Sequence, residues 1–202
     1  MHGTLRSQLL SPVQAFFRLA HKANVTAILI GGGAAMLNGS QRQTRDLDIN
    51  ISKKFALPTG QFYTRTDRDN RDNRWKVTYI AKPEEFTKID IAVRTDIDRI
   101  LPYTERLGHI VYSRADLLAV AKIRTIAERA ERAAAKRQTD LLDLEACLSS
   151  LMERGMSVCE ELWRLYLPEA TMKEFWRQVP EEEHAVLKDC FQEVGIPAAG
   201  MM

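Results

Sequence analysis

Residues 31–50 read GGGAAMLNGSQRQTRDLDIN, and this stretch decides most of what the chain can be. Three glycines follow the short apolar run Val25 to Ile30, a pattern typical of a buried strand that ends at a turn. Asp46 and Asp48 then lie one residue apart at the start of a second strand-like segment, which runs to Ile51. Because side chains two apart in a strand point to the same face, the two carboxylates are expected to project side by side.

Two neighbouring carboxylates repel one another unless one is protonated or a cation lies between them. Mg²⁺ or Mn²⁺ suits that position because a hard divalent cation prefers oxygen ligands. Asp90 lies in the middle of a third strand-like segment, Lys88 to Val93, where a buried acid is costly unless it faces the same ions. The sequence therefore predicts that Asp46, Asp48 and Asp90 hold a metal pair that activates a hydroxyl and neutralises a pyrophosphate leaving group.

The glycines predict the other half of the site. Gly31, Gly32 and Gly33 stand between the first strand and a short helical segment, residues 34–38, that Gly39 closes. Such a turn exposes backbone N–H groups that bind anions, and glycine lets phosphates approach the backbone. With Arg42 and Arg45 adding positive charge, a phosphate-binding turn followed by metal-binding carboxylates suits transfer from a nucleoside triphosphate.

Composition excludes several classes of protein. Of 202 residues 45% are hydrophobic, enough for a core, and the net charge of +2 argues neither for nor against nucleic acid. The three cysteines lie in the last third without C-x-x-C spacing, which argues against a disulfide framework and a cysteine-based zinc site. No apolar run approaches the roughly 18 residues of a membrane span, and no signal peptide is recognisable. We expect a cytoplasmic protein with no membrane partner.

The remaining patterns predict an α+β fold. A helix is expected to begin at Ser11-Pro12, and the polar residues 59–74 are expected to form an exposed loop or hairpin tip. A further strand is predicted from Trp75 to Ile80. Helical patterns follow Ser113, cover about 139–152 and continue between and beyond Pro168 and Pro180. Residues 1–112 are therefore interpreted as an α/β catalytic core, and residues 113–202 as a helical region packed on that core.

The residues named above resemble the signature of the polymerase-β-like nucleotidyltransferases, in which h-G-[GS] precedes [DE]-h-[DE]-h and h-[DE]-h. The matching segments are Ile30-Gly31-Gly32, Asp46-Leu47-Asp48-Ile49 and Ile89-Asp90-Ile91. The longer form G-G-x-A…G-x-x-R-x-T-x-D-h-D is similar to the small AbiEii-type subgroup, and residues 117–148 resemble its later helical segment, with Lys122, Arg137, Asp140 and Asp143 at the corresponding positions. The resemblance covers roughly residues 25–150.

The resemblance implies a nucleotidyltransferase fold: a small mixed sheet with flanking helices, followed by a C-terminal helical bundle. It also implies Mg²⁺-dependent transfer of a nucleoside monophosphate from an NTP to a hydroxyl, with Asp46, Asp48 and Asp90 as catalytic metal ligands. The nucleotide-binding residues would be Gly31, Gly32, Gly33, Arg42, Thr44, Arg45 and Lys122. Two departures matter. Gly33 replaces a serine that often contacts phosphate, and Ala34-Ala35-Met36 replaces the Val-Arg-Asp of CCA-adding relatives, so a tRNA role of that kind is set aside.

Alternatives remain open at this stage. Arg42 and Thr44 would only tie the loop to the strand if they bind no substrate, and Lys122 is otherwise a surface lysine of an amphipathic helix. His21, His109 and His184 are scattered and form no ligand pattern in the sequence. A non-catalytic nucleotide-sensing or protein-binding module is the second functional hypothesis. The sequence does not specify the acceptor, which can be RNA, protein or a small molecule, or the base preference. It also does not specify the oligomeric state, for which a homo-oligomer is one option, or the role of residues 155–202.

Overall fold

The computed structural model describes residues 5, 7–64, 73–129 and 133–198. Its strands are β1 (Ala27–Ile30), β2 (Asp46–Ile51), β3 (Phe62–Thr64), β4 (Arg74–Lys82), β5 (Glu85–Val93), β6 (Thr104–Leu107) and β7 (Ile110–Ser113). Its helices are α1 (Ser7–Lys22), α2 (Gly31–Leu37), α3 (Ile97–Ile100), α4 (Ala115–Ala127), α5 (Ala134–Glu153), α6 (Glu160–Tyr166), α7 (Glu169–Gln178) and α8 (His184–Glu193), with short 3-10 turns at Leu101–Tyr103 and Glu181–Glu183. The expected α+β class is confirmed.

The chain divides into two compact units. Unit 1 consists of Met1–Leu37 and Gln43–Arg114, and unit 2 consists of Asn38–Arg42 and Ala115–Met202. The division after Arg114 falls close to the boundary drawn from the sequence. The assignment of Asn38–Arg42 to the helical unit is a feature that the sequence analysis does not contain.

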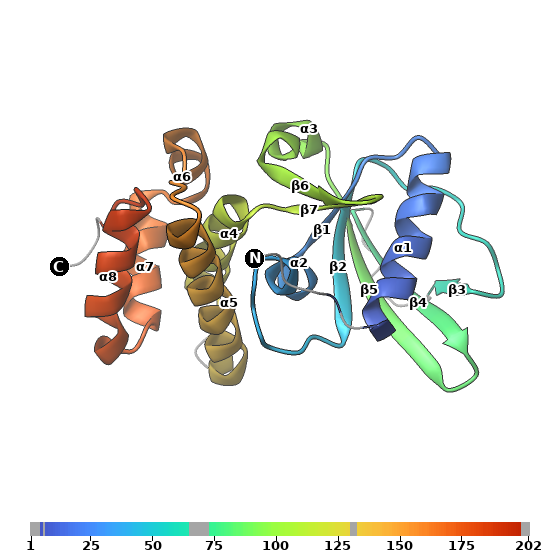
Figure 1. The fold of residues 1–202 in the computed structure, drawn as a ribbon, viewed down its shortest axis with the longest axis horizontal. Coiled ribbons are helices and arrows are strands. Elements are labelled where there is room, and N and C mark those ends of the chain that lie inside the picture. Colours follow the sequence, from blue (N-terminus) through green and yellow to red (C-terminus); the bar gives the residue numbers. More distant parts are fainter. Residues whose placement is uncertain (1–4, 6, 65–72, 130–132, 199–202) are drawn as a thin grey trace. The chain divides into compact units, whose positions relative to one another are not determined.

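The strands of unit 1 form one mixed seven-stranded sheet in the order β3-β4-β5-β2-β1-β7-β6 (Figure 1). The central strand β2 pairs antiparallel with β1 and parallel with β5, while β7 pairs parallel with β1. The remaining neighbours are the antiparallel pairs β3–β4, β4–β5 and β6–β7. Strands β2 and β5, which carry the three acidic residues, are therefore adjacent.

Period-two alternation divides the sheet into two different faces. On β2 the side chains of Leu47, Ile49 and Ile51 have no solvent exposure, and Ile89 of β5 is equally buried on the same face. Helix α1 packs against this sheet (Figure 1). The ring centroids of its Phe16 and of Phe62 in β3 are 6.4 Å apart. The residues between these apolar positions, Asp46 and Asp48 among them, belong to the opposite face.

Helix α1 begins earlier than the sequence predicts. The expected start at Ser11-Pro12 is wrong, because the helix runs from Ser7 and contains Pro12. The buried Leu9 precedes the proline by three positions and extends the apolar face made by Val13 and Phe16. Burial of that face outweighs the hydrogen bond that a proline cannot donate.

Three strands lie where the sequence predicts none. Strand β3 occupies part of the polar segment 59–74, of which residues 65–72 lie outside the described part of the chain. Strands β6 and β7 form a hairpin whose turn contains Gly108, with a φ of 59°. A glycine with positive φ at the first turn position suits a two-residue hairpin turn.

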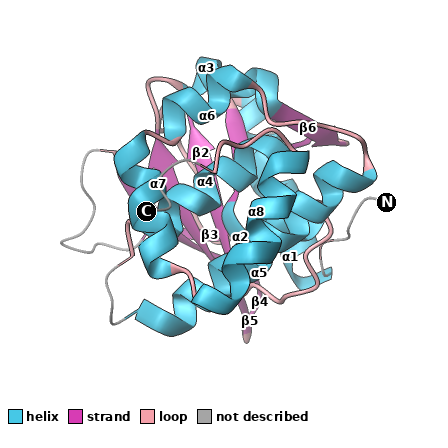
Figure 2. Cartoon of the chain, turned by 90° about the vertical axis from the view of Figure 1, so that its left-hand side faces the viewer, coloured by secondary structure: helices cyan, strands magenta, loops and turns pink. Residues whose placement is uncertain are grey.

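Unit 2 is helical, and its elements α4 to α8 are all drawn as helices in Figure 2. Helix α4 packs against α5, α6 and α7. Between α7 and α8 the rings of Phe175, Trp176 and Phe191 lie within 5.7 Å of one another, centroid to centroid. Pro168 and Pro180 precede helical turns, as their missing N–H group allows. Within the described residues no helix combines the length and the apolar character needed to cross a membrane.

Candidate functional site

The three acidic residues share one face of two adjacent strands. In the parallel pairing of β2 with β5, Asp48 stands directly opposite Asp90, and Asp46 lies one pleat repeat away on β2. Adjacent strands are about 4.8 Å apart, so the carboxylates of Asp48 and Asp90 are close neighbours. The Asp90 side chain is exposed and Asp48 is half-buried. The charges therefore lie at a solvent-accessible surface of the sheet, not in the core.

Two lysines that the sequence analysis missed stand beside these carboxylates. Lys88 is the register partner of Asp46, and Lys76 of β4 is the register partner of Asp90. Directly opposed residues in neighbouring strands project to the same face. Their positive charges offset part of the repulsion among the acids. In the sequence, Lys76 and Lys88 each occupy a polar position of an alternating segment. Only the strand register shows that these positions lie beside the acidic residues.

Thr44 fixes one of the carboxylates. Its Oγ1 hydroxyl donates a hydrogen bond to Oδ1 of Asp46 over 2.8 Å and also lies 3.2 Å from the Asp46 carbonyl oxygen. Thr44 is itself buried. The interpretation of Thr44 as a residue that ties the loop to the strand matches these contacts, and direct contact of Thr44 with a nucleotide stays a prediction.

Gly31 lies directly against Asp48. The residue has a φ of 61°, and a Cβ built on it would lie 2.2 Å from Oδ2 of Asp48. Any side chain at this position would displace the carboxylate, so glycine is needed here for both its backbone conformation and its lack of volume. At Gly33 the crowding atom is Cδ1 of Leu29, 3.2 Å from the built Cβ. Close packing within unit 1 thus accounts for two of the three glycines.

Replacement of Gly31 by alanine should destabilise unit 1 more than the same replacement at Gly108. Both glycines have a φ near 60°, so both variants bear the left-handed backbone penalty, roughly 1–2 kcal/mol. A Cβ at Gly108 meets no atom within 4 Å, whereas one at Gly31 collides with Asp48. Urea unfolding of the two variants measures the difference. Equal losses would show that Asp48 moves aside without cost.

The glycine turn and the acidic face together form the candidate site. The donor set is entirely carboxylate oxygen, which suits Mg²⁺ or Mn²⁺ and not a softer metal. The described residues contain no group of three or more His, Cys, Asp or Glu side chains already arranged to hold an ion. Binding would therefore require the side chains of Asp46, Asp48 and Asp90 to converge, which their shared face and exposure permit.

Arg42 and Lys122 lie in unit 2, in a cluster that we call the ion cluster: Ser40, Arg42, Lys122, Arg129, Asp140 and Asp143. Arg42 holds Asp143 with two donors, Nε to Oδ1 at 2.7 Å and Nη2 to Oδ2 at 2.8 Å. Lys122 Nζ lies 2.6 Å from Oδ2 of Asp143 and 2.8 Å from Oδ1 of Asp140. The interpretation of Lys122 as a surface lysine is wrong, since the residue is buried.

The ion cluster determines the protonation of its central acid. Burial raises the pKa of the Asp143 carboxyl, but the hydrogen bond from Arg42 and the charge of Lys122 outweigh burial. The pKa of Asp143 therefore lies below its ordinary value, and the carboxylate is charged at neutral pH. Contacts of Arg42 and Lys122 with a nucleotide stay predictions, because the donors described here are directed at Asp140 and Asp143. Arg45, in unit 1, is exposed.

The structure brings two of the histidines together, which the sequence does not predict. His21 of α1 and His109 of the β6–β7 turn are neighbours, with ring centroids 6.3 Å apart. They line a cavity with Arg106. Nothing in the sequence pairs residues so distant along the chain, since β6 and β7 were not predicted.

No protein-family model and no curated protein matches the chain by sequence. Solved structures do match by fold. A nucleotidyltransferase-like antigenic protein from Paracoccidioides brasiliensis is 13% identical with a TM-score of 0.65, and the match covers 92% of this chain and 93% of that one. A candidate nucleotidyltransferase from H. pylori is 19% identical with a TM-score of 0.53 over 96% of this chain and 86% of its own.

A third match is JHP933 from Helicobacter pylori, 18% identical, with a TM-score of 0.52 over 94% of this chain and 81% of that chain. At such identities the likeness concerns the arrangement of the chain and not its chemistry. The three matches agree with the mixed sheet and flanking helices described above. The chain therefore has a nucleotidyltransferase-like fold.

Proposed function

We propose that the chain is a nucleotidyltransferase, which moves a nucleoside monophosphate from an NTP to a hydroxyl acceptor and releases pyrophosphate. The observation that carries the proposal is the pairing of Asp48 with Asp90 on one exposed face, with Gly31 packed directly against the Asp48 carboxylate. A glycine turn adjoining acidic side chains joins a phosphate-binding backbone to cation-binding oxygens. A nucleoside triphosphate with its cations needs both a phosphate-binding backbone and cation-binding oxygens.

Each residue has a stated part in the proposal. Asp46 and Asp48 would hold Mg²⁺ or Mn²⁺ together with Asp90, and the ions would supply charge neutralisation on the phosphates and activation of the acceptor hydroxyl. Asp90, exposed at the same face, would help to draw the proton from that hydroxyl. Thr44 holds the Asp46 carboxylate in its orientation through the 2.8 Å hydrogen bond.

The glycine turn and nearby basic residues would bind the phosphates. The backbone of Gly31, Gly32 and Gly33 would hold the β- and γ-phosphates, and Arg45 would add positive charge from the loop. Lys76 and Lys88 add two further cationic groups on the sheet face itself. Arg42 and Lys122 remain candidate nucleotide-binding residues, and both donate to Asp143 within unit 2.

The direct test is incubation of the protein with each of the four α-labelled NTPs and Mg²⁺ or Mn²⁺ in a cell extract. We expect label to enter one class of acceptor (RNA, protein or small molecule) only when the metal is present, and EDTA to abolish the incorporation. Incorporation equal to that of extract without the protein would contradict the proposal. If an NTP raises the melting temperature only with the metal and no label is transferred, the chain is the nucleotide-sensing module instead.

A further inference from the structure

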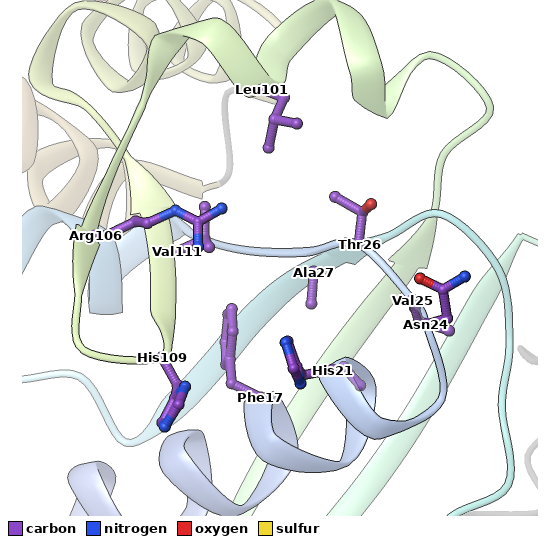
Figure 3. A pocket seen from close by; sticks show the side chains of 11 residues that line it. Phe17, His21, Asn24, Val25, Thr26, Ala27, Leu101, Arg106, His109 and Val111 are labelled. Atoms are coloured by element: carbon purple, nitrogen blue, oxygen red, sulfur yellow. The ribbon is translucent and has the colours of Figure 1, made fainter.

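The cavity lined by His21, Arg106 and His109 lies within unit 1 and has a volume of about 420 Å³ (Figure 3). It is bounded by the last turn of α1, the residues that lead into β1, the turn before β6, and the β6–β7 hairpin. Its lining is Phe17, Ala20, His21, Asn24, Val25, Thr26, Ala27, Leu101, Arg106, His109 and Val111. The candidate nucleotide-binding and metal-binding residues are absent from this lining.

The ionisable side chains that line the cavity are all basic. His21 comes from α1, Arg106 from β6 and His109 from the hairpin turn, and Figure 3 shows the three side chains around one opening. All three are exposed, so a ligand can reach them from solvent. Among the described residues none of the three forms an ion pair with a carboxylate. An arginine and two imidazoles around one opening are suited to bind a carboxylate or phosphate group.

The carbonyl end of a helix disfavours anions, and α1 ends beside this cavity. Its terminal carbonyl groups are already engaged, however. The oxygens of Leu19, Ala20 and His21 accept hydrogen bonds from the backbone N–H groups of residues 23, 25 and 24. Asn24 closes the helix in a left-handed conformation with a φ of 52°. These three carbonyl oxygens therefore all have a hydrogen-bond donor within the chain.

The floor of the cavity is apolar. Phe17, Ala20 and Ala27 are buried, while Leu101 and Val111 are half-buried beside them. A ligand that uses both parts of this lining has an apolar body and one anionic group. The site is also distant from the glycine turn, because the strand residues from Thr26 to Gly31 span up to roughly 16 Å at about 3.3 Å each.

We propose that this cavity binds a small organic anion, with its carboxylate or phosphate held by His21, Arg106 and His109 and its apolar body on Phe17. The site is separate from the proposed transfer site and does not depend on the proposed function. It is formed where α1 and the β6–β7 hairpin meet, so the ligand would bridge these two elements.

Isothermal titration calorimetry with phenyl phosphate, benzoate, inorganic phosphate and phenol tests the proposal. We expect phenyl phosphate or benzoate to bind once per chain, and the anion without the ring and the ring without the anion to bind more weakly. His21→Gln, Arg106→Gln and His109→Gln should each weaken binding at least about tenfold, the usual effect of losing one charge-assisted hydrogen bond. Thermal unfolding should be nearly unchanged, because all three side chains are exposed.

The matched control is Lys22→Gln, which removes a positive charge from α1 at an exposed residue that does not line the cavity. Its affinity for phenyl phosphate should stay within about twofold of the parent value, as for a screened surface charge. Asp48→Asn should bind phenyl phosphate as the parent does, which separates this site from the transfer site. Absence of saturable binding by both aromatic anions, or equal weakening by Lys22→Gln, would overturn the proposal.

Discussion

Asp48→Asn is expected to lower nucleotide incorporation by more than about a hundredfold while the protein remains folded. Mutation of a residue that only supports a metal ligand typically lowers metal affinity or activity by about 10–100-fold, so loss of a ligand itself should lower activity further. The stability should be unchanged or higher, because Asp48 and Asp90 are like charges directly opposed in neighbouring strands. Label incorporation and thermal unfolding of the same preparation measure both effects.

The matched control for this variant is Asp98→Asn, an exposed acid on α3 in the same unit. It removes the same charge without touching the acidic face, and its incorporation should equal that of the parent. Turnover of Asp48→Asn comparable to the parent would contradict the assignment of the acidic face. An Asp48→Asn protein that fails to fold would instead indicate that the carboxylate has a structural partner that outweighs the repulsion.

Asp143→Asn is expected to destabilise unit 2 by about 3–5 kcal/mol, the usual result of removing one partner from a buried charge pair. The Asp143 side chain has no exposure, and it accepts hydrogen bonds from Arg42, Lys122 and Ser40. Lys122 keeps Asp140 in the variant, whereas Arg42 loses the negative charge that its Nε and Nη2 groups contact. Urea unfolding followed by circular dichroism measures the change.

Glu128→Gln provides the control, since its pair with Arg124 is an exposed i,i+4 contact worth at most about 0.5 kcal/mol. A second variant, Asp143→Asn with Arg42→Met, should recover part of the loss because the guanidinium that Asp143 holds is removed together with the carboxylate. The pKa of Asp143 is depressed in the folded protein, so its contribution is present above the ordinary value of 3.8 and is lost as the pH falls through the folded pKa. The difference between parent and variant should therefore shrink in acid, and a loss no larger than that of Glu128→Gln would contradict the assignment.

Much of unit 1 follows from the sequence because its central strands alternate cleanly. Leu47, Ile49 and Ile51 alternate with Asp46, Asp48 and Asn50, so one buried face and one polar face are implied before any pairing is known. The register that sets Asp48 opposite Asp90 depends on how the strands pair and cannot be derived from either strand alone. The expectation that the three acids face the same ions nevertheless puts them on the face where the structure has them. What alternation cannot supply is the pair of lysines from β4 and β5, since their relevance depends on the register.

The edges of the sheet were not predictable in the same way. Strand β6 is half-exposed or exposed along its four residues and carries Glu105 and Arg106, so it has no hydrophobic alternation. Strand β3 has one buried residue, Phe62, within a polar segment. Such edge strands are defined by backbone pairing to a neighbour and not by their own pattern. The cavity lined by His21 and His109 could not be predicted either, because the β6–β7 hairpin forms part of it.

The ion cluster was missed because charged residues on a helix are expected to face water. Asp140 and Asp143 lie three apart on α5 and so share one side of the helix, but only contact with α4 turns that side into the interior. Lys122, on α4, is the counterion that makes the burial tolerable. A pattern of charges alone does not distinguish such a buried network from a solvated face.

The assignment of Asn38–Arg42 to unit 2 limits how this protein can be divided. Unit 1 is discontinuous along the chain, and a five-residue segment between its two parts has its ionic partner, Asp143, in α5. A truncation after Arg114 would retain Arg42 but delete the carboxylate that holds it. Deletion of the first half would likewise leave Asp143 and Lys122 without the guanidinium. The chain thus passes between the two units at three points, and recombination or domain exchange at a single crossover point between Arg42 and Asp143 would separate residues that form one ion cluster.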